Sequence, residues 1–468
     1  MLNLPRTTLC ASSDGKGRIH FLEDPMWRFR ELVGTTVQNS VFADDFKLIP
    51  YWWDEVPRPQ CEDGPLPRSV DVAVIGSGYT GLHAALQVAR GGRHTAVFDA
   101  EDAGWGCSTR NGGQVSTSIK PSYDRLARRF GAQRAYDILK EGQNSLAWLG
   151  TFIKDEKMDC DFAVVGRFHA AHNKAQYEAL ARRIENQPKG LEVEAHVVPR
   201  SEQHTEIGTD IYYGGVVYRQ HASINPARYH QELLRRVQEA GAKIFARCPV
   251  TAISKDHGNF RLNTPRGVIE ARDVIVATNG YTGALTPWLR RRVIPIGSYM
   301  IATEPLPPAL TARLIPRGRV ISDTRRVIFY YRLSPDRRRL LFGGRVSLNE
   351  TDPRLTGPKL HAEMVRIFPE LAQARITHSW CGFVAYTFDE IMHVGQHDGM
   401  YYAMGYCGAG VGTASYFGMR IGQQVLGLRE GRTALDGLPF QTRPFYYGNP
   451  WFLSASVLYY RWRDRLPL

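Results

Sequence analysis

The clearest hydrophobic pattern in the chain is a nearly continuous apolar run, followed by a glycine-rich turn and an amphipathic segment. Ser69–Gly76 is apolar at almost every position, which is typical of a strand buried on both faces of a sheet. Tyr79–Arg90 has apolar residues at helical spacing and stops at Gly91-Gly92, and His94–Asp99 follows as a second strand. A strand, a glycine turn, a helix and a strand within about thirty residues predict one βαβ unit.

The middle of the chain alternates between helical and strand-like periodicity. Apolar residues at mixed three-four spacing predict helices over 121–158, around Gln176–Asn186 and over Pro226–Ala240. Asp161–His169 and Ile211–Tyr218 are strand-like and flank the second of these helices.

Short strand-like segments follow the third helix. Lys243–Ala246, Val250–Ser254, Phe260–Asn263 and Val268–Glu270 are separated by turn residues and predict a small antiparallel meander. Asp273–Ala277 is another buried run. Further strands are predicted at Val293–Ala302, Val327–Leu333, Arg339–Val346 and Met400–Met404, with a last long helix from about Thr413 to Leu428.

The composition is that of a globular protein and excludes several classes. Of 468 residues, 43% are apolar and 22% charged, which rules out a disordered or collagen-like chain. The net charge of +13 raises the question of a nucleic-acid partner. The densest basic runs, Arg290–Arg292 and Arg337–Arg339, each precede strand-like sequence, so we favour solvated hairpin ends and predict no nucleic-acid binding.

Cysteine usage and the N-terminus indicate the compartment. The seven cysteines are sparse and never paired as CxxC, and the fourteen histidines form no metal spacing, so we predict a reducing compartment and no metal. Met1–Arg6 shows no charged region followed by an apolar core, and we expect a cytoplasmic protein. The stretch nearest to a membrane span, Pro444–Tyr460, is interrupted by glycine and proline.

The turn after the first strand, Gly76-Ser77-Gly78-Tyr79-Thr80-Gly81, matches the G-x-G-x-x-G pattern of dinucleotide sites. The first glycine makes the tight turn, the second lets the backbone approach a pyrophosphate, and the third lets helix and strand pack closely. Asp99 lies 23 residues after Gly76, close to the roughly 20 expected for an acid that binds a ribose hydroxyl. The acid argues against NADP. A strand–turn–helix without a ligand is the alternative.

The next loop separates a flavin from a nicotinamide cofactor. Gly104–Gln114 is a second glycine-rich loop that begins five residues past Asp99. A nicotinamide domain has no need of such a loop, whereas the long polar diphosphate and ribityl chain of FAD need small residues with free N–H groups against them. Arg110 would supply charge near the diphosphate or the ring. A surface loop is disfavoured because small residues bracket the Arg110-Asn111 pair on both sides.

Two further segments end in small residues suited to a flavin. Val274–Ala277 runs into Thr278-Asn279-Gly280, and Gly405–Gly412 precedes the last helix. A glycine turn at a helix N-terminus presents free N–H groups and a positive dipole, which would stabilise reduced flavin; a tight helix entry is the structural alternative. The predicted cofactor-binding residues are Gly76, Gly78, Tyr79, Thr80, Gly81, Asp99, Arg110, Asn111, Gly112, Gly113, Gln114, Val250, Thr278, Gly280, Gly408, Gly410, Val411 and Gly412.

These motifs resemble the FAD-dependent glycine/D-amino-acid oxidase superfamily over about residues 50–440. Ser108–Gln114, Ile301–Leu306 and Tyr330-Tyr331-Arg332 with Leu341–Arg345 are most similar to the gamma-glutamylputrescine oxidase branch. The resemblance implies oxidation of a C–N bond by hydride transfer to flavin N5, giving an imine that hydrolyses to an aldehyde or keto product. The implied substrate is a small-molecule amine or amino acid, with gamma-glutamylated or other secondary amines favoured.

The resemblance also implies an α/β fold of the glutathione-reductase/D-amino-acid-oxidase type, with a Rossmann-like FAD-binding domain interleaved with an antiparallel-sheet substrate domain. Trp27, Phe29 and Leu32 are expected on a short helix of an N-terminal extension. The predicted division is 1–68 for the extension, 69–158, 219–285 and 376–440 for the FAD-binding domain, 159–218 and 286–375 for the substrate domain, and 441–468 for a C-terminal aromatic tail.

The chain departs from the superfamily in its lysines and in one cysteine. Sarcosine-oxidase relatives carry a lysine where this chain has Gly412, and another on a substrate-domain strand, whereas no lysine occurs here between Lys255 and Lys359. An oxidase using O2 is favoured; a membrane- or carrier-linked FAD dehydrogenase and a flavin-containing binding or assembly protein are the alternatives. Cys381 falls about one residue from the covalent flavin cysteine of relatives, so we expect non-covalent FAD.

The predicted catalytic residues are Tyr299, Tyr331 and Arg345, which with Tyr330 lie on expected strands of the second domain. Aromatic rings beside an arginine could cage an amine and hold a distal carboxylate. Ordinary sheet packing is the alternative for each residue. The sequence does not indicate an oligomeric state.

The tail combines aromatic residues with Arg461, Arg463 and Arg465, as a membrane-interface anchor would. A tail packed across its own domain, or a subunit contact, would show the same residues. Pro444 and Pro450 interrupt any long helix, and the aromatic positions of the whole tail do not keep one helical face. We therefore predict a packed tail rather than a membrane anchor.

Overall fold

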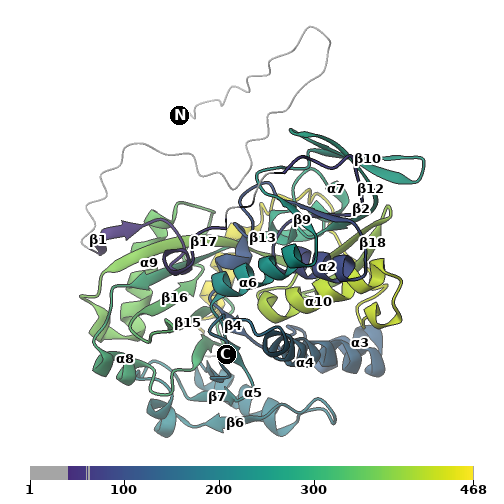
Figure 1. The fold of residues 1–468 in the computed structure, drawn as a ribbon. Coiled ribbons are helices and arrows are strands. Elements are labelled where there is room, and N and C mark those ends of the chain that lie inside the picture. Colours follow the sequence, from purple (N-terminus) through teal and green to yellow (C-terminus); the bar gives the residue numbers. More distant parts are fainter. Residues whose placement is uncertain (1–40, 60, 62–63, 467–468) are drawn as a thin grey trace, which may run out of the picture. The chain divides into compact units, whose positions relative to one another are not determined.

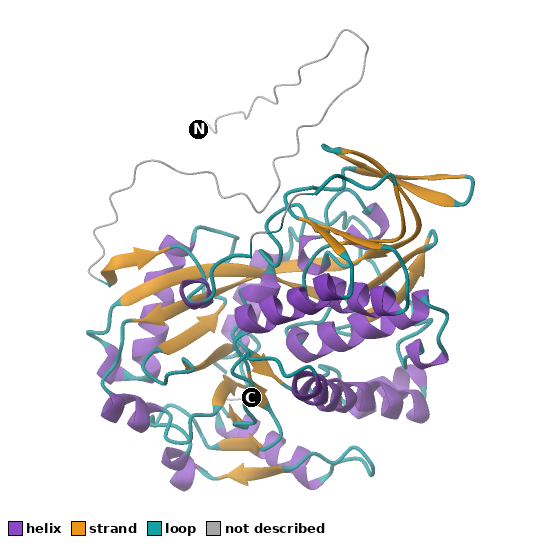
Figure 2. Ribbon diagram, viewed as in Figure 1, coloured by secondary structure: helices purple, strands orange, loops and turns teal. Residues whose placement is uncertain are grey.

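Two large β-sheets organise the part of the chain that the computed structural model describes, which is residues 41–59, 61 and 64–466 (Figure 1). Helices cover one face of each sheet, and loops join the two sheets (Figure 2). Smaller elements are β4 (Gln114–Val115) paired with β8 (Ala222–Ser223), α1 (Trp52–Glu55), α3 (Tyr123–Phe130), α5 (Lys174–Glu185), α7 (Pro287–Arg290), α8 (Pro308–Leu314), α11 (Leu453–Arg463), and the 3-10 turns η1 (Cys107–Thr109), η2 (Arg200–Thr205), η3 (Asn279–Tyr281), η4 (Pro369–Leu371) and η5 (Arg429–Gly431).

The eight-stranded sheet carries the predicted βαβ unit. Its order is β10 (Ala252–Asp256), β11 (Asn259–Thr264), β12 (Gly267–Val276), β2 (Ser69–Ile75), β3 (Thr95–Phe98) and β9 (Lys243–Phe245), with β19 (Met400–Met404) beside β12 and β18 (His393–His397) beside β19. β2, β3, β9, β12 and β19 run parallel. Val72, Ala73 and Val74 of β2 are inaccessible to solvent, which explains the continuous apolar run of that strand.

Two helices that flank this sheet approach each other closely. A Cβ added to Gly418 of α10 (Gly410–Val425) would lie 2.4 Å from the carbonyl oxygen of Thr80 in α2 (Tyr79–Arg90), so only glycine fits there. α4 (Ala132–Asp155) and α6 (Pro226–Glu239) lie beside this pair (Figure 1). Side chains of the four helices form one buried core with β2.

The nine-stranded sheet is mixed and lies beside the first. Its order is β1 (Phe42–Lys47), β17 (Ile376–Thr387), β13 (Val293–Thr303), β16 (Leu340–Gly344), β15 (Phe329–Leu333), β14 (Val320–Asp323), β5 (Arg167–Ala170), β7 (Gly215–Tyr218) and β6 (Ala195–Val198). α9 (Pro353–Ile367) packs on β13, β16 and β17. Its Leu360 and Met364 share a buried core with Tyr299 and Phe342 of the sheet.

The α/β fold class is confirmed, and α2 has the bounds that its apolar spacing predicts. The prediction of separate strands at Val268–Glu270 and Asp273–Ala277 was wrong, because β12 runs through both. β9 was also wrongly placed in the meander, since it pairs with β3 in the parallel ladder. Gly131, at a φ of 84°, divides the helix predicted over 121–158 into α3 and α4.

β17 was not predicted as a strand. Its first half contains Thr377, His378 and Ser379, which are polar yet buried and so conceal the strand pattern. β17 pairs with β13 along nearly its whole length. Ile376–Thr387 therefore lies in the nine-stranded sheet, whereas the sequence division placed 376–440 in the FAD-binding domain.

The predicted N-terminal extension contributes to the fold from residue 41 onward. β1 pairs with β17, and Trp52 of α1 is inaccessible and donates its indole N–H to the Asn111 carbonyl at 2.9 Å. The helix expected around Trp27, Phe29 and Leu32 lies outside the described residues. Within the described ranges, no helix is both long and apolar enough to cross a membrane.

Acidification is expected to destabilise the protein through its buried histidines. The imidazole of His83 lies 2.6 Å from the Tyr229 hydroxyl, and burial lowers the pKa of His83 to about 3. In the unfolded chain the histidine has its ordinary pKa near 6.5, whereas in the folded chain its pKa is about 3. Between these two pH values, each unit of acidification therefore lowers the free energy of unfolding by about 1.4 kcal/mol for each such histidine. Burial also lowers the pKa of His169 to about 3 and that of His230 to about 4.

Thermal unfolding at pH 7 and pH 5 measures this effect. We expect a lower unfolding midpoint at pH 5 than at pH 7. The difference should be smaller in His83→Gln, because this variant lacks the histidine that binds a proton only in the unfolded chain. His257, whose side chain is 98% exposed, provides the matched control: His257→Gln should keep the pH dependence of the unmodified protein. An equal pH dependence in His83→Gln would contradict the assignment.

Candidate functional site

Three glycine-rich segments meet at the carboxyl edge of the parallel strands. Ile75 at the end of β2 and Tyr402 of β19 both pair with Val276 at the end of β12, so the turns that follow these strands lie side by side. The N–H of Gly405 donates to the Asn279 side-chain oxygen at 2.9 Å, and a Cβ on Gly76 would lie 2.9 Å from the Ala277 carbonyl oxygen. Ligands of open parallel sheets bind at this edge, so the structure brings the predicted motifs into one place.

The first turn is shaped for a close backbone approach. Gly76 has a φ of +105°, and a Cβ on Gly81 would lie 1.9 Å from the Gly76 carbonyl oxygen, which only glycine avoids. Gly78 is the N-cap of α2 and provides no side-chain cap. The N-cap residue thus leaves backbone N–H groups of the first turn for other partners, and the positive end of the helix lies toward the loop, which suits an anion such as a diphosphate.

Asp99 holds this turn together. One oxygen of its carboxylate accepts the Ser77 N–H at 2.7 Å and the Ser77 hydroxyl, while the other accepts the Glu101 N–H at 3.0 Å. Burial is the main cause of a raised pKa of Asp99. His230, which donates toward the Ser77 carbonyl at 2.8 Å, fixes the turn from the other side. The carboxylate thus has a structural role that the sequence analysis, which assigned it to a ribose hydroxyl, did not anticipate.

The second loop covers the start of α2. The Ser108 hydroxyl accepts the Tyr79 N–H at 2.9 Å, which satisfies one of the free amides at that helix end. Asn111 stabilises the loop from within, because its side chain donates to the Cys107 and Ser108 carbonyls and accepts the Gly113 N–H. The loop is therefore ordered by its own polar contacts.

Arg110 fastens the loop to the nine-stranded sheet. Its guanidinium lies over the rings of Trp53 and Trp105, at 4.7 and 4.2 Å from their centroids. It also donates to the Trp105 carbonyl at 2.6 Å and to the Cys381 carbonyl at 3.2 Å. Burial lowers the pKa of Arg110. These contacts join the loop to the sheet, a role that was not assigned to Arg110 from the sequence, where its charge was expected near the diphosphate or the ring.

Gln114, Val250 and Gly280 also have packing partners in the structure. The Gln114 amide donates to carbonyls of β14 and β15 at 3.1 and 3.3 Å. Val250 is buried in the core with Phe98 and other side chains of the β3 region. A Cβ on Gly280 would lie 2.8 Å from the Phe383 carbonyl oxygen, so this glycine lets η3 approach β17. Thr278 bonds to the Thr282 hydroxyl at 2.8 Å.

The third loop turns sharply into α10. Gly405, Cys407 and Gly408 have φ values of 80°, 51° and 94°, and the Cys407 N–H donates to the Ala385 carbonyl of β17 at 3.0 Å. α10 begins at Gly410, with an Ala409 N-cap that provides no side-chain cap. Val411 and Gly412 are the next helical residues, so the positive helix end follows the loop directly.

One face of the nine-stranded sheet lies against the second loop. A Cβ on Gly112 would lie 3.1 Å from the Tyr330 ring and 3.5 Å from the Met300 side chain. The indole N–H of Trp380 donates to the Arg110 carbonyl at 2.8 Å. Because successive residues of a strand point to opposite faces, residues at even numbers on β13, β15 and β17 face the glycine loops.

The three predicted catalytic residues have their partners away from that face. Tyr299 donates to Glu350 at 2.9 Å, and Tyr331 donates to the Tyr212 hydroxyl at 3.0 Å; both are inaccessible and share the core under α9. Arg345 is buried and paired with Glu350 at 2.8 Å. Tyr299 lies on β13 and Tyr331 on β15, as expected, whereas Arg345 follows the end of β16. A shift of one residue along a strand exchanges the faces of the sheet, so the neighbours of Tyr299 and Tyr331 point toward the glycine loops.

Two residues that the sequence analysis missed lie on the glycine-loop side. Tyr386 of β17 is the one neighbour that a Cβ on Gly408 would meet within 4 Å, with its hydroxyl at 3.7 Å. The Lys120 ammonium lies 5.2 Å from the centroid of the Tyr386 ring, and the Tyr386 phenol is the main cause of a raised pKa of Lys120. Lys120 is exposed and positively charged. The nearby Glu390 is already paired with Arg125 and Arg326.

These features fit FAD better than a metal. Two uncapped helix starts, three glycine turns and an exposed cation can hold a long, doubly charged nucleotide. Among the residues that the structure describes, no group of three His, Cys, Asp or Glu side chains could bind a metal ion.

Comparison with known proteins agrees with this geometry. Residues 71–424 match the family model described as FAD dependent oxidoreductase. The chain is 31% identical over 430 residues to the probable oxidoreductase OrdL of Rhizobium meliloti (strain 1021), covering 89% of this chain and 97% of the relative. It is 31% identical over 408 residues to the gamma-glutamylputrescine oxidoreductase of Escherichia coli (strain K12), covering 85% and 93%.

Solved structures show the same fold. The glycine oxidase of Geobacillus kaustophilus gives a TM-score of 0.69 at 18% identity, with 81% of this chain and 99% of that chain covered. The L-proline dehydrogenase of P. horikoshii gives a TM-score of 0.65 at 16% identity, with 84% and 99% covered. The fold therefore serves enzymes named as oxidases and as dehydrogenases.

Proposed function

The chain belongs to the family of FAD-dependent oxidoreductases, and we propose that it oxidises the C–N bond of an amine or amino acid that carries a carboxylate, with O2 as the acceptor. When bound, FAD would supply the acceptor for a hydride from the carbon next to the nitrogen, while the nitrogen gives up a proton. Water then hydrolyses the resulting imine to an aldehyde or keto product and an amine or ammonia. The observation that carries the proposal is the Lys120–Tyr386 pair beside Gly408. Gamma-glutamylated amines are the leading substrates, supported by the name of the relative from Escherichia coli.

The chain offers backbone groups for each part of the cofactor. The start of α2 at Gly78 suits the diphosphate, the Gly112–Gly113 segment suits the ribityl chain, and the start of α10 at Gly410 suits the electron-rich edge of the ring. The Tyr330 side of the sheet would then cover the ring and exclude water from the reacting bond.

A carboxylate on the substrate would lie against Lys120. Lys120 is an exposed residue, its ammonium carries three donors, and its pKa is raised by the neighbouring Tyr386. The Tyr386 ring and the Tyr330 ring supply apolar surface for the methylene groups on either side of the amine. A substrate held at its carboxylate end presents its C–N bond to the loop side of the sheet in one orientation.

Acid precipitation is expected to release FAD from the protein in chemically intact form, because no covalent bond holds it. Cys381 lies on β17 opposite Tyr299, on the α9 side of the sheet, away from the glycine loops. Burial raises the pKa of the Cys107 and Cys407 thiols to about 11, so both remain protonated and poorly nucleophilic at neutral pH. Absorbance of the supernatant measures the released flavin. Yellow colour that stays with the pellet would show a covalent bond.

Lys120→Met is expected to raise the KM for a carboxylate-bearing amine by about 10-fold or more, because a charged hydrogen bond of roughly 1.5–3 kcal/mol is lost. The KM for the matched amine without the carboxylate should stay unchanged. Lys174→Met removes a lysine whose side chain is 80% exposed and provides the control. Equal losses for both amines would contradict a role of Lys120 in carboxylate binding.

Anaerobic mixing with a panel of amines tests the proposed reaction. We expect bleaching of the flavin by gamma-glutamylated or other carboxylate-bearing secondary amines, and no bleaching by primary alcohols. A panel without any bleaching would rule out the proposal and favour a binding or assembly protein. Reoxidation of the reduced flavin in air then distinguishes an oxidase from a dehydrogenase. Reduced flavin that persists for minutes in air would favour the dehydrogenase. The absence of lysine between Lys255 and Lys359 is the sequence feature that suggests this alternative.

A further inference from the structure

The C-terminal helix α11 has an apolar face that the described part of the chain does not cover. Ala455, Leu458, Tyr459 and Trp462 recur at i, i+3, i+4 and i+7 and therefore share one side of the helix. Leu458 and Tyr459 are each 53% exposed, and Trp462 is 58% exposed. The aromatic residues of the whole tail share no helical face, because only some of them lie on α11. We call these four residues the outer face.

The opposite side of α11 is firmly attached to the protein. Leu453 and Val457 are buried, and the Ser454 hydroxyl donates to the Asn349 side chain at 2.6 Å. Arg461 donates to the Arg345 carbonyl at 3.1 Å. The helix is thus fixed by its inner side, and the outer face points away from the contacts that hold it.

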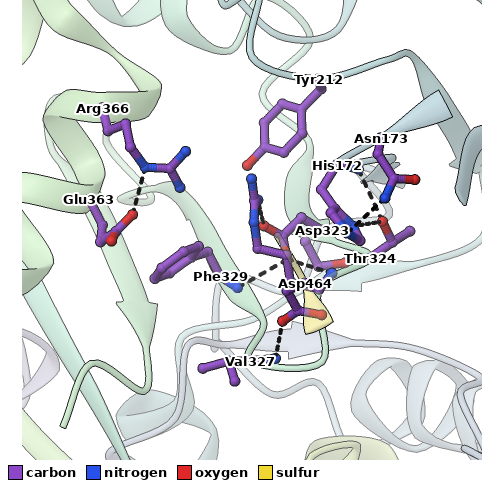
Figure 3. Close-up of polar contacts among 12 residues, drawn as sticks. His172, Asn173, Tyr212, Asp323, Thr324, Val327, Phe329, Glu363, Arg366 and Asp464 are labelled. Atoms are coloured by element: carbon purple, nitrogen blue, oxygen red, sulfur yellow. Dashed lines mark hydrogen bonds and ion pairs between the residues drawn. The ribbon is translucent and has the colours of Figure 1, made fainter. Parts of the chain in front are cut away.

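The charges around the outer face are arranged by sign. Asp464, the one acidic residue of the tail, points inward, where its two oxygens accept the N–H groups of Arg326 and Val327 at 3.0 Å each (Figure 3). Arg463 and Arg465 on either side of it are exposed. An apolar stripe flanked by cations therefore remains on the surface, while the tail's own carboxylate is used in a backbone contact.

We propose that α11 docks on an anionic lipid membrane, with Leu458, Tyr459 and Trp462 in the interfacial layer and Arg463 and Arg465 against lipid headgroups. Tyrosine and tryptophan prefer the level of the headgroups, and arginines near the surface are attracted to anionic lipids. The eleven residues of α11 are too few to span a bilayer, so the helix lies in the plane of the interface. A symmetric contact with a second copy is disfavoured, since the arginines of both copies would enter one interface without a carboxylate of the tail to pair with them.

Vesicle co-sedimentation of the full chain tests the proposal. We expect the protein to pellet with phosphatidylcholine vesicles that contain about a third phosphatidylserine, and to pellet less as salt increases. Leu458→Ser, Tyr459→Ser and Trp462→Ser combined should reduce the bound fraction by about 10-fold or more. The matched control combines Val164→Ser, Val268→Ser and Leu355→Ser, which are 63%, 45% and 47% exposed elsewhere on the surface, and should bind like the unmodified protein.

A second variant tests the charges alone. Arg463→Gln with Arg465→Gln should weaken binding to the anionic vesicles and reduce its salt dependence. The proposal would be overturned if the unmodified protein stays in the supernatant, or if the outer-face triple variant binds vesicles as well as the control triple variant. Sedimentation equilibrium identifies the other occupant: a dimer that the outer-face triple dissociates, without vesicle binding, would assign the face to a second copy. Without vesicles, amines should bleach the flavin equally in all these variants. An absence of bleaching would therefore count against the proposed reaction and not against membrane docking.

Discussion

Gly78→Val is expected to yield a colourless apoprotein whose affinity for FAD is lowered by at least about 100-fold. A Cβ at Gly78 would lie 2.9 Å from the Ser108 hydroxyl, which itself accepts the N–H of Tyr79. The valine side chain would therefore push the second loop away from the start of α2 and occupy the space where a diphosphate approaches. Visible absorbance of the purified protein and titration of the apoprotein with FAD measure the loss.

The choice of Gly78 separates a cofactor effect from misfolding. A side chain at Gly81 would meet the Gly76 carbonyl oxygen at 1.9 Å and disrupt the turn itself, whereas the neighbour at Gly78 is a side-chain hydroxyl that can move. Gly283 is the matched control, because it is exposed and an added Cβ there meets nothing within 4 Å. Gly283→Val should be purified yellow. Full flavin content in Gly78→Val would place the nucleotide site elsewhere.

The first half of the site could be predicted from the sequence because its signals are local. The run of Ser69–Ile75, the turn at Gly76 and the spacing of Tyr79–Arg90 each depend on residues close in the chain, and the structure gives the same helix bounds. The position of Asp99 was predicted by the same spacing. Its contacts with Ser77 were not, since they depend on how the second strand approaches the turn.

The proposed substrate side could not be predicted because it depends on pairing between distant strands. β17 brings Tyr386 to Gly408, but Thr377, His378 and Ser379 conceal this strand in the sequence. Lys120 lies far from the stretch where the superfamily carries its lysine, and only the folded chain places it at Tyr386. Local patterns thus predict the motifs, while the face of a sheet follows from its register.

Tyr330→Leu and Tyr331→Leu are expected to give opposite results, although the two residues are neighbours on β15. The Tyr330 ring lies toward Gly112, and its hydroxyl bonds to Ser298 at 2.8 Å on the same side of the sheet. Tyr331 is inaccessible and packs on Phe342, with ring centroids 5.3 Å apart, under α9. One side chain therefore borders the proposed reaction space, and the other fills the core.

Tyr331→Leu should lower the free energy of unfolding by about 2 kcal/mol, because it leaves a cavity and removes the hydrogen bond to Tyr212. Its kcat/KM per bound flavin should stay unchanged. Tyr330→Leu should lower kcat/KM by about 10-fold or more with a small effect on the unfolding midpoint, because the substrate loses a wall that orients it. Thermal unfolding and steady-state kinetics on the same preparations measure both quantities.

The pair distinguishes the two faces even if one variant is poorly stable, because kcat/KM is referred to bound flavin. Tyr299→Phe extends the comparison to β13: it removes the contact with Glu350 on the α9 side and should leave kcat/KM unchanged. A large loss of kcat/KM in Tyr331→Leu or Tyr299→Phe, with Tyr330→Leu unaffected, would mean that the substrate meets the side of the sheet that α9 covers. That side is closed by Leu360 and Met364, so such a result would require α9 to move before a substrate could enter.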